Sequence, residues 1–167
     1  LNLDADYIAM FDDDTIPGPR WLENCLATLE KTEGLLGTRG LRFLTQHRYY
    51  PYESFGWDNP NPETERVDIV GHAWFFRRAY LAHFWSELPP RDWSKTSGED
   101  MHFSYTLQKA GIGTFVPPHP PENHDLWGSL PEYGRKFGAD NASISQSIES
   151  LSKFDRVVQY YVSRGFK

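Results

Sequence analysis

An uninterrupted apolar run at residues 7–11 leads directly into three aspartates at residues 12–14, and a Pro-Gly pair follows at 17–18. A short continuous apolar run is typical of a strand buried on both faces, and Pro and Gly end such a strand. The pattern therefore predicts a core strand with three carboxylates at its carboxyl end. In open α/β sheets, ligands bind at that edge.

Apolar positions along the rest of the chain predict further strands and helices in alternation. Helical spacing follows the Pro-Gly pair until Gly34, and another helix opens at Glu99 and stops at Gly111. This alternation predicts an α/β fold with a mixed, mostly parallel sheet flanked by helices. The remaining predicted elements are strands over 35–44, 67–76 and 112–116 and a helix over 78–86.

The C-terminal part of the chain has a different pattern. Apolar residues recur at helical spacing in two stretches, one around Ile148 and one over residues 154–161. We therefore expect a core over residues 1–140 and a helical tail over residues 141–167. The apolar stripes of the tail suit packing on the core, contact with a partner or contact with a membrane surface.

Composition narrows the classes of function. The 167-residue chain carries a formal net charge of −6, whereas a nucleic-acid-binding surface is normally basic. The single cysteine, Cys25, excludes a disulfide framework and any zinc site built from several cysteines. No apolar run approaches the roughly 18 residues of a membrane span. We expect a cytoplasmic protein without nucleic-acid partners or a transmembrane segment. Because the sequence begins at Leu1, we also expect a piece of a longer chain.

Residues 46–66 are rich in aromatic side chains, among them Trp57. Structureless segments of this length are uncommon in compact domains, and the aromatic content argues against disorder. Aromatic rings beside polar groups suit sugar rings and also protein interfaces. The segment is therefore predicted to be a binding loop, or else a lid that covers part of the core.

The spacing of the three aspartates suggests a metal site. Side chains alternate along a strand, so Asp12 and Asp14 are expected to point to one side and Asp13 to the other. Two carboxylates on one side repel each other, and a divalent cation with oxygen ligands removes that repulsion. The alternative is a polar turn whose acids favour the N-terminus of the following helix.

Two further groups have the residue types for chemistry. Glu99 and Asp100 open a helix, where a carboxylate can act as a general base. With Ser97 as the N-cap, the same residues also resemble a capping box. His119 and His124 follow the last predicted strand, and a neutral imidazole can complete a metal site begun by carboxylates. The alternative for each histidine is an ordinary surface position.

Taken in order, these motifs resemble those of GT-A glycosyltransferases, most closely the inverting, family-two-like enzymes. The first shared features are a hydrophobic strand that ends in Asp-x-Asp and a later strand that carries Gly71. A Gly-Glu-Asp segment at 98–100 then opens a helix that ends in Lys-Ala-Gly at 109–111. A histidine follows the next strand. The resemblance covers residues 6–124. It implies a GT-A-like, Rossmann-like fold and transfer of a sugar from a nucleotide-sugar donor, with UDP-sugars favoured, to an acceptor hydroxyl.

The resemblance also implies roles for individual residues. Asp12 and Asp14 match the acids that hold Mn²⁺ or Mg²⁺ on the donor diphosphate. His124 fits the spacing of the late metal-binding histidine better than His119 does. Asp100 matches the catalytic base of inverting members. Other positions are expected to bind the substrates: Asp13, Trp57, Gly71, His72, Trp74 and Glu99.

One part of the family pattern has no counterpart in this sequence. The first strands and helices of such enzymes hold the nucleotide base, so we expect the fold to be incomplete at its N-terminus. One alternative is therefore a GT-A-like domain that binds nucleotide or sugar without turnover. Another is a haloacid-dehalogenase-like phosphatase, whose first Asp of a similar Asp-x-Asp is a nucleophile. That family also needs a lysine, and Lys95 and Lys109 fit its pattern poorly.

Overall fold

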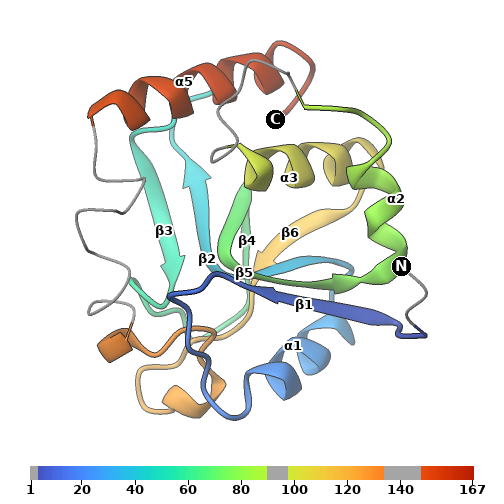
Figure 1. Ribbon diagram of the computed structural model, residues 1–167. Helices are drawn as coiled ribbons and strands as arrows, with labels where there is room; N and C mark the ends of the chain where they lie inside the picture. The colour runs from blue at the N-terminus through green and yellow to red at the C-terminus, as the bar shows by residue number, and fades with distance from the viewer. Residues whose placement is uncertain (1–3, 90–97, 134–147) are drawn as a thin grey trace.

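The computed structural model describes residues 4–89, 98–133 and 148–167, and a six-stranded sheet organises them (Figure 1). For residues 148–151 only the backbone is described. The strands follow the order β1-β5-β2-β6-β4, and β3 pairs with the second half of β2. In chain order they are β1 (Tyr7–Phe11), β2 (Gly34–Phe43), β3 (Tyr52–Gly56), β4 (Glu65–Val67), β5 (Ile69–Arg77) and β6 (Gly113–Val116).

The direction of the strands differs from the prediction. Among the described strands, only β2 and β6 pair in parallel. The pairs β1–β5, β2–β5, β2–β3 and β4–β6 are antiparallel. The fold is therefore mixed α/β with a mostly antiparallel sheet, and the predicted mostly parallel sheet is wrong. The reason is that a continuous apolar run reports burial on both faces, which antiparallel strands between two helical layers also have.

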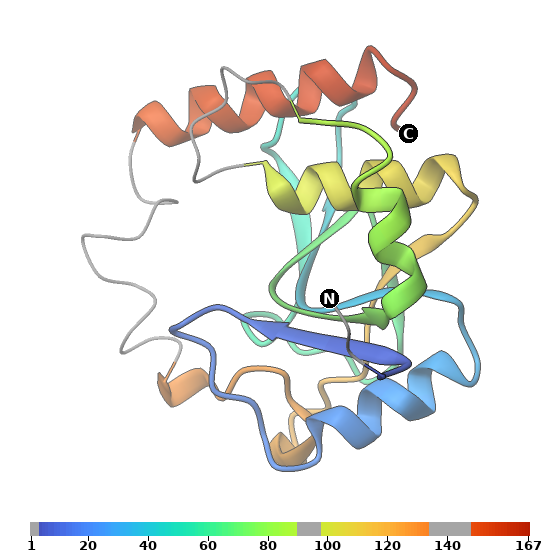
Figure 2. The ribbon, with the colours of Figure 1, turned by 45° about the vertical axis from the view of Figure 1, so that its right-hand side comes forward.

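Helices cover both faces of this sheet (Figures 1 and 2). Most of them match predicted helices, and α3 is followed by Gly111 at φ 77°, the expected glycine stop. None of the described helices is long and apolar enough to cross a membrane. The helices are α1 (Trp21–Leu29), η1 (Arg78–Tyr80), α2 (Leu81–Phe84), α3 (Glu99–Lys109), η2 (His124–Leu126) and α5 (Ile148–Val162).

Neighbouring residues of the central strands pack into opposite layers. On β5, Phe75 belongs to the cluster around α1, whereas Phe76 packs edge-to-face on Phe103 of α3. On β2, Leu36 joins the α1 cluster and Leu35 joins the α3 cluster. Strand alternation thus divides the core into two halves, one on each face of the sheet.

Strand β1, which carries the aspartates at its end, is not a core strand. It pairs with β5 alone among the described strands. Tyr7 and Ile8 are partly buried, but Met10 and Phe11 are 49% and 40% exposed. The predicted burial on both faces is therefore wrong for the second half of β1. The apolar start of the strand does serve the core, because the ring of Tyr7 stacks on Phe75.

Residues 46–66 are not structureless, because β3 lies within them and β4 begins at Glu65. Part of their aromatic content packs against the C-terminal helix. The ring of Tyr49 stacks on Phe154 of α5 with centroids 4.7 Å apart, and the Tyr49 backbone N–H donates to Asp155 Oδ1 at 2.8 Å. The segment therefore contributes two strands to the sheet and a contact to α5.

The C-terminal helix packs on the core, the first of the three arrangements that its apolar stripe allows. Val157, Val158 and Tyr161 are buried together with side chains of β2, β5 and α3. The hydroxyl of Tyr161 lies 2.7 Å from His102 Nδ1 in α3. One helix, α5, spans the second predicted helix of the tail and begins at Ile148. The first predicted helix, on Ile144, Ile148 and Leu151, lies outside the described residues up to residue 147, and its remainder belongs to α5.

Truncation of Val158 to alanine is expected to destabilise the fold by about 2 kcal/mol, because its side chain is fully buried between α5 and the core. That cost corresponds to a fall in Tm of about 4–8 °C for a chain of this size. Calorimetric melting measures it. The control is Arg156→Ala, which changes an exposed position of the same helix. Equal melting temperatures of the two variants would show that α5 does not dock as described.

Candidate functional site

The turn that follows β1 is held against the middle of β5. The backbone N–H of Asp12 donates to the carbonyl of His72 at 3.0 Å, and Thr15 Oγ1 donates to the same carbonyl at 2.9 Å. The Thr15 backbone N–H donates to Asp12 O at 3.1 Å and closes the turn. These bonds fix the aspartates beside His72.

Three side chains at this turn form a group of potential metal ligands. Asp12, Asp14 and His72 each offer one ligand atom, and these atoms all lie within 4.8 Å of one another. Asp12 and Asp14 therefore come together as predicted, but through the turn after β1 and not through strand alternation, because the strand ends at Phe11. Asp13 is exposed and is not part of the group. Carboxylates suit Mn²⁺ and Mg²⁺, and a neutral imidazole can complete such a site. The donor set thus fits one divalent cation.

His72 has a backbone conformation that is rare for a residue with a side chain. Its φ is 63°, and its carbonyl accepts both hydrogen bonds from the turn after β1. Burial, and secondarily Arg39, lower the pKa of the imidazole against a smaller opposite effect of Asp14 and Asp58. The ring is therefore kept neutral, which is the form that binds metals. The resemblance to GT-A enzymes implied that His72 binds substrate. Its position beside the aspartates depends on the pairing of β1 with β5, which leaves no local pattern in the sequence.

The predicted metal ligand His124 is not in this group. It is exposed in η2, and its ring lies against Trp127 with centroids 4.3 Å apart. Its backbone, rather than its imidazole, meets the turn after β1, because a Cβ on Gly18 would come within 2.3 Å of the His124 carbonyl oxygen. The spacing along the chain was compatible with a ligand, but the contacts of η2 turn the residue to the surface.

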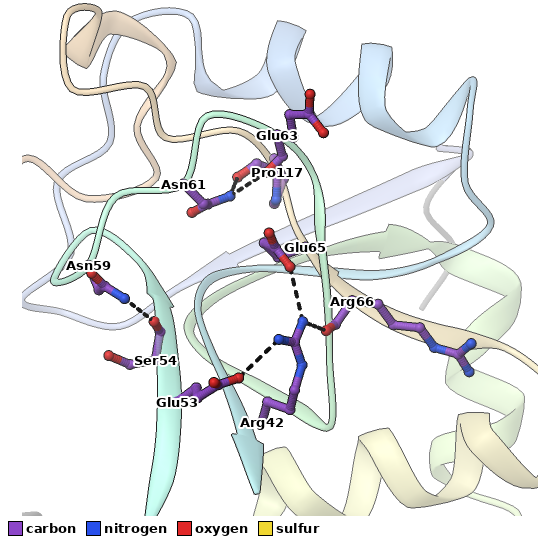
Figure 3. Close-up of polar contacts among 9 residues, drawn as sticks. All are labelled: Arg42, Glu53, Ser54, Asn59, Asn61, Glu63, Glu65, Arg66 and Pro117. Atoms are coloured by element: carbon purple, nitrogen blue, oxygen red, sulfur yellow. Dashed lines mark hydrogen bonds and ion pairs between the residues drawn. The ribbon is translucent and has the colours of Figure 1, made fainter. Parts of the chain in front are cut away.

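The alternative ligand, His119, is a buried residue whose ring is hydrogen-bonded within the fold. Its Nδ1–H donates to Pro117 O at 2.8 Å, and its Nε2 accepts the backbone N–H of Gly128 at 3.0 Å. Burial lowers its pKa to about 4, so the imidazole is neutral. Asn61 anchors the same segment through its Nδ2, which donates to Pro117 O at 3.0 Å (Figure 3). Both ring nitrogens of His119 are therefore used by the fold.

Asp100, the predicted general base, lies in the first turn of α3 against β5. Its Oδ1 accepts a hydrogen bond from Trp74 Nε1 at 2.9 Å, and a Cβ on Gly71 would come within 2.8 Å of its Oδ2. Burial, and then the charges of Glu99 and Asp12, raise the pKa of Asp100 well above its ordinary value, while the Trp74 bond lowers it. Gly71 and Trp74, both predicted to bind substrate, thus orient Asp100.

The first turn of α3 is not closed by a side-chain cap in the described residues. Gly98 at the N-cap has φ 101° and makes no side-chain cap bond, and Ser97 of the proposed capping box lies outside the described residues. Glu99 is exposed, and its charge is among the causes that raise the pKa of both Asp12 and Asp100. The charge of Glu99 therefore acts on both the metal-ligand group and Asp100.

The pKa of Asp12 reflects the density of negative charge at this site. It is raised to about 6, first by partial burial of the carboxyl and then by the charges of Asp14, Glu99 and Asp13. Like charges that share a small space disfavour the ionised form. A bound divalent cation reverses this effect, because it favours the ionised carboxylate.

Aromatic and charged side chains flank His72 on the side of β3. The ring of Trp57 meets His72 edge-to-face at 5.7 Å, and Trp57 Nε1 is buried without a hydrogen-bond partner among the described residues. Arg39 Nε donates to Asp58 Oδ2 at 2.8 Å, with each side chain 23% exposed. Arg39 and Asp58 escaped sequence reasoning because they come from separate segments, β2 and the turn after β3.

Replacement of Trp74 by phenylalanine is expected to raise the pKa of Asp100, because the indole bond is the one described contact that lowers it. The phenyl ring keeps an aromatic contact with Phe103, on which Trp74 now packs at 5.3 Å. Carbon-13 NMR titration of the carboxyl groups measures this upward shift of the Asp100 pKa. The control is Trp85→Phe, at a tryptophan that is 65% exposed. An unchanged Asp100 titration in Trp74→Phe would mean that the bond does not control this carboxyl.

The lysines required by the phosphatase alternative do not support it. Lys109 lies at the far end of α3 from Asp100 and pairs with Glu87. Lys95 lies outside the described residues. Lys109 is therefore not a partner of a nucleophilic Asp12.

Comparisons with known proteins give no family for this chain. No model of a known protein family matches it, and no curated protein matches it either.

Proposed function

We propose that this chain belongs to a metal-dependent, inverting glycosyltransferase that moves a sugar from a nucleotide-sugar donor to an acceptor hydroxyl. The observation that carries the proposal is the adjacency of two different chemical groups. Asp12, Asp14 and His72 form a set of potential metal ligands, and the residue next to His72, Gly71, lies against the carboxyl of Asp100. Such an enzyme needs both a cation site for the leaving diphosphate and a base for the attacking hydroxyl.

The proposed metal site consists of Asp12, Asp14 and His72, and it takes Mn²⁺ or Mg²⁺. A cation held there would offset the negative charge of the departing nucleotide diphosphate. The chain supplies the ligands in a fixed arrangement, since the turn after β1 is bonded to the His72 carbonyl. Because the fold holds the ligands in place before the cation binds, less free energy is spent on bringing the like-charged carboxylates together around it.

Asp100 is the proposed general base. Its raised pKa supports the role, because a carboxylate that is costly to ionise accepts a proton more readily near neutral pH. Its Oδ1 is held by Trp74, which leaves Oδ2 to accept the proton of the acceptor hydroxyl. Loss of that proton makes the oxygen nucleophilic as it attacks the anomeric carbon from the face opposite the leaving diphosphate, so the anomeric configuration inverts.

Trp57 and the Arg39–Asp58 pair are proposed to bind the sugars. An aromatic face beside a paired guanidinium and carboxylate matches a sugar ring, which has apolar C–H faces and a rim of hydroxyls. UDP-sugars are the favoured donors because of the resemblance to GT-A enzymes, and the acceptor is a saccharide or another hydroxyl compound. Glu99 and Asp13 are exposed, and we propose that they contact the substrates as well.

The experiment that tests the proposal is calorimetric titration of UDP and GDP into the protein with and without Mn²⁺, followed by a transfer assay with UDP-sugars. Nucleotide binding that requires the metal, together with sugar transfer to an acceptor panel, supports it. Metal-dependent binding without transfer under any condition would favour the non-catalytic binding domain. Absence of metal-dependent binding in both this chain and the longer protein would refute the proposed donor site.

A further inference from the structure

A concave site lies at the far end of α3 from Asp100. A cavity of about 660 Å³ opens between the end of α3, strands β4 and β6, and residues 165–167. This volume is within the range of about 300–1,000 Å³ that is usual for small-molecule sites. None of the residues to which we assign a role in sugar transfer lines it, so it is a separate site.

The walls of this cavity are rich in positive charge, although the chain as a whole has a net charge of −6. Asp68 is the one acidic residue among the lining side chains, and its carboxylate accepts the Phe43 backbone N–H at 2.6 Å. The cationic lining residues are Arg42, Arg66, Lys109 and Lys167. A local excess of cations against the charge of the whole chain points to an anionic ligand.

Two of these cations are already compensated. Arg42 donates to Glu53 and Glu65 at 3.0 Å each, and Lys109 pairs with Glu87. Arg66 is different, because its side chain extends away from Arg42 and its two carboxylates (Figure 3). No ion pair of Arg66 or Lys167 is found among the residues that the structure describes. Among the described residues, Arg66 is thus the arginine of this cavity without an ion pair, although its charge acts on the carboxyl of Asp68. A guanidinium suits carboxylates and phosphates.

A buried hydroxyl provides a second, independent indication of a ligand. Ser104 of α3 lines the cavity and is 2% exposed, and its Oγ has no hydrogen-bond partner among the described residues. Buried polar groups are nearly always satisfied, and an unsatisfied one calls for a ligand or an ordered water. The fold therefore leaves one hydroxyl donor unused at a site rich in cations.

Part of the cavity wall is apolar. Val67 and Phe166 are 5% and 4% exposed, and Ile112 is partly buried beside them. Inorganic ions gain nothing from such a surface, whereas an organic molecule buries its apolar part there. We propose that this cavity binds a small organic anion, with its carboxylate or phosphate on Arg66 and Ser104 and its apolar part on Val67, Ile112 and Phe166.

The test is an NMR titration of the nitrogen-15-labelled full chain with four probes: phenyl phosphate, benzoate, inorganic phosphate and phenol. At least one organic anion should shift the amide signals of residues 66–68, 104 and 112–114. It should bind about tenfold or more tightly than both phenol and inorganic phosphate, since only it uses the charge and the apolar wall together. The comparison of phenyl phosphate with benzoate identifies the preferred anionic group. Equal binding of phenol, or shifts confined to other parts of the chain, would overturn the proposal, as would no binding at all.

Two variants make the test specific to these residues. Arg66→Gln should lower the affinity for the organic anion by about tenfold. The control is Arg20→Gln, at an exposed arginine that pairs with Glu23 on α1, and it should change this affinity by less than about twofold. Ser104→Ala should weaken binding by about fivefold and raise the Tm of the ligand-free chain by about 2 °C, because it removes an unsatisfied buried hydroxyl. Unchanged affinity in Arg66→Gln, or a lower Tm in Ser104→Ala, would show that the assignment of these groups is wrong.

Discussion

Asp100→Asn is expected to lower the rate of sugar transfer by about 10³-fold and to leave Mn²⁺-dependent UDP binding within about threefold of the wild type. An amide of nearly the same shape keeps the oxygen that accepts the Trp74 bond but cannot take a proton from the acceptor hydroxyl. Initial rates measure the first effect and calorimetry the second. A large loss of transfer rate with nearly unchanged UDP binding identifies a general base, whereas a residue that only binds the donor would lose UDP affinity as well.

The matched control for this variant is Glu23→Gln, which removes one carboxylate from the exposed face of α1. Transfer by that variant should stay within about twofold of the wild type. The loss of a general base usually costs roughly 10²–10⁴-fold in rate. If Asp100→Asn retained transfer at a tenth of the wild-type rate or better, the loss would fall short of that range and the assignment would fail. Glu99, the neighbouring carboxylate in the same helical turn, would then be the next base to examine.

The same carboxyl sets the expected pH dependence of catalysis. Because the pKa of Asp100 is raised well above its ordinary value, the group is protonated at pH values where an exposed aspartate is already ionised. Only the ionised form accepts a proton, so kcat/KM of the wild type should rise with pH and level off above that pKa. The residual activity of Asp100→Asn should lack this rise.

Loss of Asp14 is expected to weaken Mn²⁺ binding by about 100-fold or more, since one of three ligands of the group disappears. The control for metal binding is Asp13→Asn, which removes the neighbouring charge without touching the ligand set and should cost less than about threefold. Calorimetric titration of Mn²⁺ measures both. Equal losses in the two variants would mean that overall negative charge, not the described geometry, attracts the ion.

The melting temperature provides an independent test of the proposed metal-ligand group. In the absence of metal, Asp14→Asn should melt about 2 °C above the wild type, because the charge of Asp14 is one cause of the raised pKa of Asp12. At about one hundred times its Kd, Mn²⁺ should stabilise the wild type by about 2.7 kcal/mol, and the variant far less. A metal-dependent rise in Tm that survives in Asp14→Asn would place the ion elsewhere.

The pKa of Asp12 fixes the pH range of these effects. The carboxyl titrates at about 6 in the folded protein and at 3.8 by its ordinary value, so its neutral form is the one the fold favours. Its stabilising contribution is complete below about pH 3.8 and is lost as the pH rises through about 6. Mn²⁺ needs the ionised carboxylate, so its affinity should fall below about pH 6, where protons compete for Asp12.

Two substitutions of His72 separate the role of its imidazole as a metal ligand from the effect of its backbone strain. Asn tolerates a positive φ better than other residues with a side chain, so His72→Asn removes the imidazole at little backbone cost. His72→Ala removes the imidazole and keeps the strain. Both variants should lose Mn²⁺ affinity by about tenfold or more if the imidazole is a ligand. Loss in His72→Ala alone would mean that the shape of the turn, not the ring, matters.

The sequence by itself determined the local elements and the side on which the two key aspartates lie. The helical spacing after the Pro-Gly pair and the glycine at 111 are short-range features, since a helix depends on contacts within four residues along the chain. The spacing of the aspartates likewise predicted that Asp12 and Asp14 come together without Asp13, although the turn after β1, and not strand alternation, groups them.

The tertiary structure alone decided how the strands run and what lies beside the aspartates. Apolar runs predict that β5 is buried, but its antiparallel position between β1 and β2 depends on pairings far apart in sequence. That pairing brings His72, rather than His124, to the aspartates, and it aligns Gly71 and Trp74 with Asp100. Hydrophobic patterns encode burial, whereas strand direction and side-chain neighbours follow from packing over the whole chain.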